Sequence, residues 1–269
     1  MVASQTQAGQ TQAGQTHEGH VQAQFGARAG AYVESAVHAR GPDLDALAGM
    51  LAGQSVARLL DLGCGGGHVA YTAAPLVREV VAYDLSAEML EAVDAAARTR
   101  GLANIRTERG AAERLPFSDA SFDWVATRFS AHHWTDMPAG VAQMARVLRP
   151  GGRAVVIDTV APDSPKGDSF LQAIEMLRDP SHVRNYRAAE WRAAAAAAGL
   201  AVAWAGMHRL PLDFATWIAR MRTPAPAAQA IRDLQAAMPA EVRAMFDVAE
   251  DGSFAIDVLT LHLIHVSDS

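Results

Sequence analysis

Cysteine is nearly absent from this sequence, since Cys64 is the only one in 269 residues and no disulfide can form within the chain. Basic residues are not in excess: 23 Lys and Arg stand against 29 Asp and Glu, without the positive charge typical of nucleic-acid or anionic-membrane binders. No apolar run reaches the length of a membrane span, and the N-terminus lacks a basic-then-apolar secretion signal. We therefore expect a cytoplasmic protein with neither nucleic acid nor membrane as partner.

Half of the residues are hydrophobic, which is enough for a sizeable core. The first 20 residues differ, because the pentapeptide QTQAG at 5–9 is repeated at 10–14 and almost nothing there can fill a core. The composition predicts a disordered tail over 1–20 and a single domain over 21–269. His17 and His20 lie in that predicted tail, where two histidines make a poor metal site.

Strand and helix patterns alternate through the middle of the chain. We expect strands at 58–62, 79–83, 104–109, 122–128 and 153–158, with helices at 68–74, 87–100 and 138–148 between them. Such alternation predicts an α/β fold with a parallel sheet. Helices are also expected at 25–33 and 44–51, and in a helical elaboration at 170–177, 188–198, 214–222, 227–237 and 241–249. Two further strands are expected at 201–208 and 255–266, and we expect the strand at 255–266 to close the edge of the sheet.

A glycine-rich turn follows the first of these strands in LLDLGCGGGH, residues 59–68. Its spacing is G-x-G-x-G, whereas a dinucleotide fingerprint needs glycine or alanine where His68 stands, and no Lys-Ser or Lys-Thr follows as in a P-loop. Asp84 ends the next strand, where a carboxylate can accept hydrogen bonds from both ribose hydroxyls. Ser86 already provides a helix N-cap, so capping does not require Asp84.

Together these segments resemble class I S-adenosylmethionine-dependent methyltransferases. Residues 59–68 look like their motif I, and Asp84 looks like the acidic residue that closes their second strand. Residues 113–117 with 122–125, and residues 148–153, resemble the segments before their fourth and fifth strands. Over 25–266 the chain resembles the ubiquinone-biosynthesis-like type 11 subgroup. The resemblance implies a Rossmann-like, seven-stranded, mostly parallel sheet with helices on both faces and a helical insert before the last strand. It also implies S-adenosylmethionine as cofactor and S-adenosylhomocysteine as product.

The same resemblance implies which residues bind the cofactor. One departure is Ala111, which stands where many family members carry an acid for the adenine amino group, so we expect that contact from the Ala112 backbone or from Glu113. Cys64 is either a nucleophile or a small buried residue, and no partner base favours the former. The expected cofactor-binding residues are Asp61, Gly63, Cys64, Gly65, Asp84, Leu85, Met89, Ala111, Ala112, Glu113 and Arg128.

Candidate catalytic groups follow the fourth and fifth strands. His132 or His133 could take a proton from the acceptor, because imidazole titrates near neutrality, or the pair could be structural. Asp158 is a second candidate base, or else a partner of a nearby basic group. A metal site at the two histidines is not expected, since adjacent side chains in a strand or turn point apart.

The residues that would contact the acceptor are less sharply marked. Arg128, Arg184 and Arg220 could anchor an acidic acceptor or form surface ion pairs. Phe25 and Tyr32 belong to a lid helix or to the core, and Trp134 covers the core or the substrate region. Trp191, Trp204 and Trp217 line an acceptor pocket or pack between helices.

The predicted function is methyl transfer to a small molecule, either an apolar one such as a quinone precursor or polyketide, or an acidic metabolite. The methylated atom stays open. Two other functions remain possible on the residues alone: a non-catalytic S-adenosylmethionine sensor, and a nicotinamide-dependent dehydrogenase.

Overall fold

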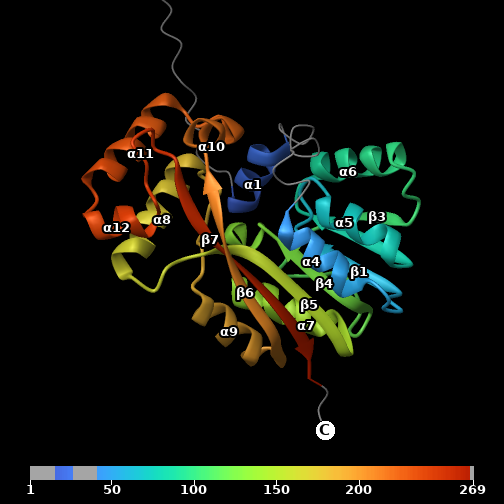
Figure 1. Cartoon of the computed structure of the whole chain (residues 1–269). Coiled ribbons are helices and arrows are strands. Elements are labelled where there is room, and N and C mark those ends of the chain that lie inside the picture. Colours follow the sequence, from blue (N-terminus) through green and yellow to red (C-terminus); the bar gives the residue numbers. More distant parts are fainter. Residues whose placement is uncertain (1–15, 27–40, 267–269) are drawn as a thin grey trace, which may run out of the picture.

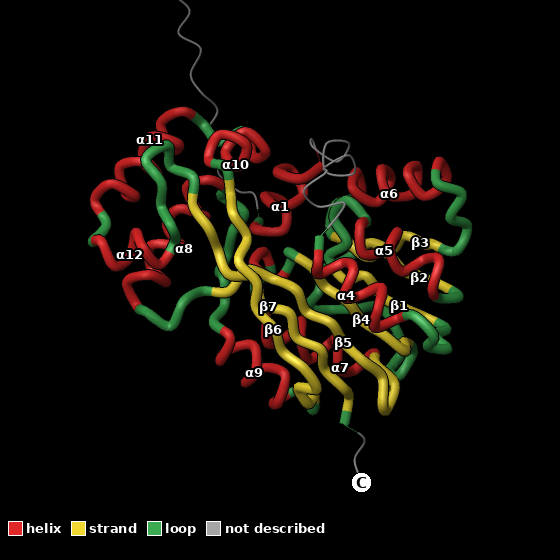
Figure 2. Tube along the Cα trace, in the orientation of Figure 1, coloured by secondary structure: helices red, strands yellow, loops and turns green. Residues whose placement is uncertain are grey.

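The computed structural model describes residues 16–26 and 41–266, and it contains one seven-stranded sheet in the order β3-β2-β1-β4-β5-β7-β6 (Figures 1 and 2). The first five strands are parallel, and β7 runs antiparallel to both β5 and β6. This confirms the predicted α/β class with a mostly parallel sheet. The strands are β1 (Arg58–Leu62), β2 (Glu79–Asp84), β3 (Ile105–Arg109), β4 (Phe122–Arg128), β5 (Leu148–Val160), β6 (Leu200–Leu212) and β7 (Phe254–His265).

The position of β7 corrects the expectation that the last strand closes the sheet edge. β7 lies between β5 and β6, and β6 is the edge strand. Consecutive residues of β7 such as Val258 and Leu259 are both buried, so both faces of the strand are covered. In β6, Trp204 and Met207 are 51% and 64% exposed, which suits a strand with one neighbour.

Helices cover both faces of the sheet. One face carries α4 (Pro42–Leu51), α5 (His68–Ala73) and α6 (Ala87–Thr99), and the other carries α7 (Met137–Val147) and α9 (Ala188–Ala197). The strand period of two explains this division, since Leu59 packs into the cluster of the first face and Leu60 into that of the second. As expected, Ser86 caps α6 by accepting a hydrogen bond from the Met89 amide. After α5, a 3₁₀ helix of one turn, η1 (Ala74–Leu76), contains Pro75, which ends α5.

Four further helices gather at one end of the sheet, around the ends of β6 and β7 (Figure 1). They are α8 (Pro165–Arg178), α10 (Phe214–Met221), α11 (Ala225–Ala237) and α12 (Ala240–Met245). Their own apolar cluster, with Phe170, Trp217 and Ile231 at its centre, also takes in Ile256 of β7. Among the described residues, no helix is long and apolar enough to cross a membrane.

The N-terminal helix α1 (His17–Gly26) begins inside the segment 1–20 that composition predicts to be a disordered tail. The Thr16 hydroxyl accepts a hydrogen bond from the Gly19 amide at its start, and the His17 ring lies 2.9 Å from the carbonyl oxygen of His133. Composition misses this helix because a contact with a residue far along the chain fixes it. Of the two expected lid residues, the Phe25 side chain and all of Tyr32 lie outside the described part of the protein.

Candidate functional site

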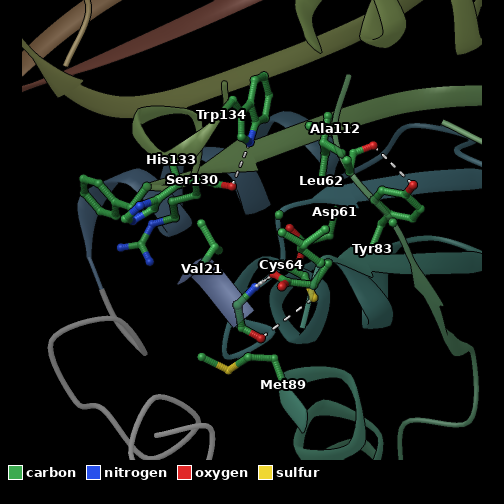
Figure 3. Close-up of a pocket in the computed structure, with 18 of the residues that line it drawn as sticks. Val21, Asp61, Leu62, Cys64, Tyr83, Met89, Ala112, Ser130, His133 and Trp134 are labelled. Atoms are coloured by element: carbon green, nitrogen blue, oxygen red, sulfur yellow. Dashed lines mark hydrogen bonds between the residues drawn. The ribbon is translucent and has the colours of Figure 1, made fainter. Parts of the chain in front are cut away.

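A cavity opens at the carboxyl ends of β1, β2 and β4, with about 1080 Å³ of empty volume including its mouth. The side chains of Val21, Cys64, Met89, His133 and Trp134 surround it (Figure 3). Every residue that the sequence analysis assigned to the cofactor lines this one cavity. The segments 61–66, 83–85, 110–113, 128–130 and 133–135 supply most of its wall, and α1 adds His17, Glu18 and Val21.

The glycine turn is held tightly against β2 and the loop after β4. The amides of Gly63 and Cys64 both donate to the carbonyl of Tyr83, at 2.8 and 3.0 Å. Gly63 has φ +69°, and a Cβ at this position would overlap the Ser130 hydroxyl. That hydroxyl also accepts a hydrogen bond from Trp134 Nε1 at 3.2 Å (Figure 3). Only glycine therefore allows the turn and the β4 loop to approach so closely.

Asp84 presents a pre-oriented carboxylate to the cavity. Its Oδ2 accepts from the Gly65 amide at 2.8 Å and its Oδ1 from the Ser86 amide at 3.0 Å. Burial raises the pKa of Asp84, against the effect of these hydrogen bonds. Each carboxylate oxygen has a second lone pair, so Asp84 can accept two more hydrogen bonds from a ligand.

A second buried acid, Asp61, accepts from the Ala70 amide at 2.9 Å. Burial raises the pKa of Asp61 to about 7, and the charge of Asp84 adds to the effect. Arg128, the one arginine among the described residues of the wall, forms a buried ion pair with Asp43. With Glu18 also in the wall, the cavity carries more negative than positive charge and favours a cationic ligand.

The segment after β3 is fixed by its own hydrogen bonds. Glu113 Oε1 accepts from the amide and the hydroxyl of Thr135, at 2.8 and 2.9 Å, so this carboxylate joins the two loops at the cavity rim. The Tyr83 hydroxyl donates to the carbonyl of Ala111 at 3.3 Å (Figure 3). Burial raises the pKa of the Cys64 thiol well above its usual range, which keeps the thiol protonated at neutral pH.

A second cavity, of about 1210 Å³, adjoins the first and shares Arg128, Phe129 and His133 with it. Among its other lining residues are the predicted His132 and Arg220, together with Trp217 and Asn185. Arg184 is not one of the described lining residues of either cavity, because it pairs with Asp168 at 2.9 Å and with Glu190 at 3.5 Å. Trp191 is buried in the core between the sheet and α9, and Trp204 is exposed.

In the wall of the second cavity, a short 3₁₀ helix, η2 (Ala131–His133), carries the two adjacent histidines. His132 Nδ1 lies 2.7 Å from Asp158 Oδ1, while Asp158 Oδ2 accepts from the Ala131 amide at 2.9 Å. The ring centroids of His132 and His133 are 4.3 Å apart, and that of His182 is 5.7 Å from His132. The expectation that the neighbouring histidines point apart is therefore wrong, because the segment is a helical turn and not a strand.

The two histidines differ in protonation. Burial disfavours the His132 cation, but the charge and hydrogen bond of Asp158 outweigh burial and raise the pKa of His132 above its ordinary value. Burial and the neighbouring His132 lower the pKa of His133 to about 4. His133 Nδ1 lies 3.0 Å from the carbonyl oxygen of Ser181, which accepts a hydrogen bond from the ring N–H. Of the two, His132 is thus the imidazole whose cation the site stabilises.

Comparison with known proteins matches residues 60–156 to the methyltransferase domain family Methyltransf_11. Uncharacterized protein YafE of Escherichia coli is 47% identical over 193 residues, which cover 72% of this chain and 93% of that protein. Uncharacterized methyltransferase YcgJ of Bacillus subtilis is 38% identical over 201 residues, 75% of this chain and 79% of that protein. The crystal structure of YcgJ superposes with a TM-score of 0.81 at 34% identity, covering 84% of this chain and 99% of that one.

Proposed function

Since the chain belongs to the class I S-adenosylmethionine-dependent methyltransferases, we propose that it methylates a small molecule held in the second cavity, with His132 as general base. Its cofactor is S-adenosylmethionine and not a nicotinamide nucleotide.

The residues of the first cavity fit S-adenosylmethionine in charge. The cofactor carries a sulfonium, an ammonium and one carboxylate group, so it is a net cation, and the carboxyl groups of Glu18, Asp61 and Asp84 line the wall. We assign Asp84 to the ribose hydroxyls, because both of its oxygens already hold backbone amides and keep a lone pair each. Met89 and Ala112 supply apolar wall for the adenine ring.

In the bound state the cofactor supplies a methyl group activated by its positive sulfur. Asp158 holds the His132 ring by Nδ1, which leaves Nε2, on the opposite edge of the ring, for the acceptor. His132 Nε2 would take the proton of the acceptor, and the electron pair freed on the acceptor would then be available for the activated methyl group. Asp158 then stabilises the imidazolium that forms.

The observation that carries this proposal is the His132–Asp158 pair in the wall of a cavity that adjoins the cofactor site. A protein that only senses S-adenosylmethionine has no use for an oriented imidazole there, so the pair favours catalysis. Small-molecule rather than polymer acceptors agree with the net charge of −6 and with the size of the second cavity.

The test is methyl transfer from labelled S-adenosylmethionine to a bacterial metabolite extract, followed by mass analysis of the labelled product. We expect a labelled small molecule with the wild-type protein and none with His132→Ala. Both proteins should bind S-adenosylhomocysteine equally well by titration calorimetry. Equal labelling by the two proteins would contradict the role of His132.

A further inference from the structure

The side-chain amide of Asn185 is a buried hydrogen-bond donor at the wall of the second cavity. Asn185 is only 2% exposed and lines that cavity, yet its Nδ2 has no hydrogen-bond partner in the structure. Leaving such a donor unsatisfied costs the desolvation of the group, so a native protein keeps few of them without a reason. A ligand atom in the cavity would remove this cost.

The backbone around this amide is already fixed. Gln172 Oε1 accepts a hydrogen bond from the backbone amide of Asn185, and Gln172 Nε2 donates one to the backbone carbonyl of Asn185, both at 2.9 Å. His182 Nε2 lies 3.0 Å from the same Gln172 oxygen. The backbone groups of Asn185 are therefore both hydrogen-bonded to Gln172, and the side-chain carboxamide extends from a fixed backbone. Such an arrangement is what a pre-organised binding group requires.

Asn185 and the proposed base belong to the same wall. The amide of Val183, two residues before Asn185, donates to the carbonyl of His132 at 2.8 Å. His132 and Asn185 therefore belong to adjoining segments that both line the cavity. The remaining wall includes the apolar side chains of Leu210, Trp217 and Ile256.

Most of the charged side chains in this wall have a local ion-pair or hydrogen-bond partner. Asp43 pairs with Arg128, and Glu175 Oε2 lies 3.1 Å from Arg178 Nη1. Asp179 Oδ1 accepts from the Ser181 amide and hydroxyl, at 2.9 and 2.6 Å. Arg209 pairs with Asp247 and Asp257. Arg220 adds a further cation to the wall. A ligand with little net charge fits a wall in which most acidic and basic side chains already have a partner.

We propose that Asn185 is an acceptor-binding residue, and that the acceptor is a neutral ring compound with an ionisable hydroxyl and a carbonyl oxygen. Asn185 Nδ2 donates to the carbonyl oxygen, and His132 Nε2 takes the hydroxyl proton. The proposal rests on the proposed function, since it assumes that the second cavity holds the methyl acceptor. It also chooses between the apolar and acidic acceptors that the sequence left open.

Matched phenols test the proposal in the presence of saturating S-adenosylhomocysteine. 4-Hydroxyacetophenone and 4-ethylphenol differ chiefly in the carbonyl oxygen, and the corresponding acetyl and ethyl 2-naphthols extend the comparison to two rings. By titration calorimetry, we expect the wild-type protein to bind the carbonyl member of at least one pair about 10-fold more tightly, the value of one net hydrogen bond. Equal affinities within both pairs, or no saturable binding of any carbonyl probe at millimolar concentration, would overturn the proposal.

Two variants separate Asn185 from the rest of the site. Asn185→Asp keeps the shape but replaces the donor, and Asn185→Leu removes the polar group; both should lose the preference for the carbonyl probe. Unchanged preference in a variant that still binds S-adenosylhomocysteine would overturn the role of Asn185. Tighter binding of 4-hydroxybenzoate than of 4-hydroxyacetophenone would overturn the assignment of a neutral acceptor. If the wild-type protein bound no S-adenosylhomocysteine, the proposed function itself would fail.

Discussion

His132 lies in η2, shortly after β4, and Asp158 lies near the end of the neighbouring parallel strand β5; their Nδ1 and Oδ1 atoms are 2.7 Å apart. β4 and β5 bring them together, since Arg128 pairs with Ile157 in the strand register. The carboxylate fixes the tautomer of the imidazole and raises its pKa. This pair therefore sets both the geometry and the pH range of the proposed proton transfer.

Removing the charge of Asp158 should change the pH profile of methyl transfer. His132 must be neutral to act as a base, so activity should rise with pH through its raised pKa, above the ordinary value of 6.5. In Asp158→Asn we expect this rise at lower pH and kcat lowered by about 100-fold. Steady-state kinetics from pH 5 to 9 provides the measurement. An unchanged profile would exclude Asp158 as the positioning residue, and unchanged S-adenosylhomocysteine affinity serves as the control.

Asp84→Asn should weaken cofactor binding without altering the fold. The variant keeps the side-chain shape but loses charge-assisted hydrogen bonds, so we expect 10- to 100-fold weaker binding of S-adenosylhomocysteine, or about 1.5–3 kcal/mol. Titration calorimetry measures the affinity. Asp94→Asn is a matched control, because Asp94 pairs with Arg98 on the exposed side of α6. Equal affinity in the Asp84 variant would remove Asp84 from the cofactor site.

The buried Asp61 should make the ligand-free protein less stable as pH rises. Its folded-state pKa of about 7 lies above the ordinary 3.8, so the stability it contributes is present below pH 3.8 and is lost as pH rises through 7. Asp61→Asn should remove a slope of about 1 kcal/mol per pH unit between pH 4 and 7. Urea unfolding at several pH values measures it, and parallel pH dependences of variant and wild type would contradict the raised pKa.

His182 should contribute a pH dependence of the opposite sign. Burial, followed by the charges of His132 and His133, lowers its pKa to about 2. A depressed pKa gives stability that is present above pH 6.5 and is lost as pH falls toward the folded-state value. We expect His182→Gln to resist acid better than wild type below pH 6.5, by about 1 kcal/mol per pH unit. Circular dichroism during acid titration measures the midpoint of unfolding. An equal midpoint for His182→Gln and wild type would mean that His182 is already charged in the folded protein.

Two glycines separate backbone strain from close packing. Gly53 and Gly63 both have positive φ, but a Cβ would meet nothing within 4 Å at Gly53, whereas at Gly63 it would overlap the Ser130 hydroxyl. Alanine should cost about 1 kcal/mol at Gly53 through its left-handed backbone alone. At Gly63 we expect a larger loss in urea unfolding, together with weaker S-adenosylhomocysteine binding. Equal losses of stability at the two positions would show that the Ser130 side chain moves aside at little cost in free energy.

The parts of the molecule that could be predicted from the sequence are those encoded locally. The turn around Gly63 and the carboxylate of Asp84 lie in short segments whose strand and helix patterns are clear, and the structure brings both to one cavity. The pairing of His132 with Asp158 depends on the register between two strands. The role proposed for Asn185 depends on a buried amide without a partner, which no periodicity reveals. The order of β6 and β7 depends on which strand is covered on both faces.

The internal position of β7 has a consequence for biosynthesis. β5 ends at Val160, yet its outer neighbour in the sheet begins at Phe254, so the ribosome adds the intervening residues in roughly 5–20 s at ordinary elongation rates. During that interval the first five strands and the glycine turn can assemble while the far edge of β5 stays open to wrong pairing. A nascent chain that captures its nucleoside ligand early would hold this half together until the final hairpin arrives.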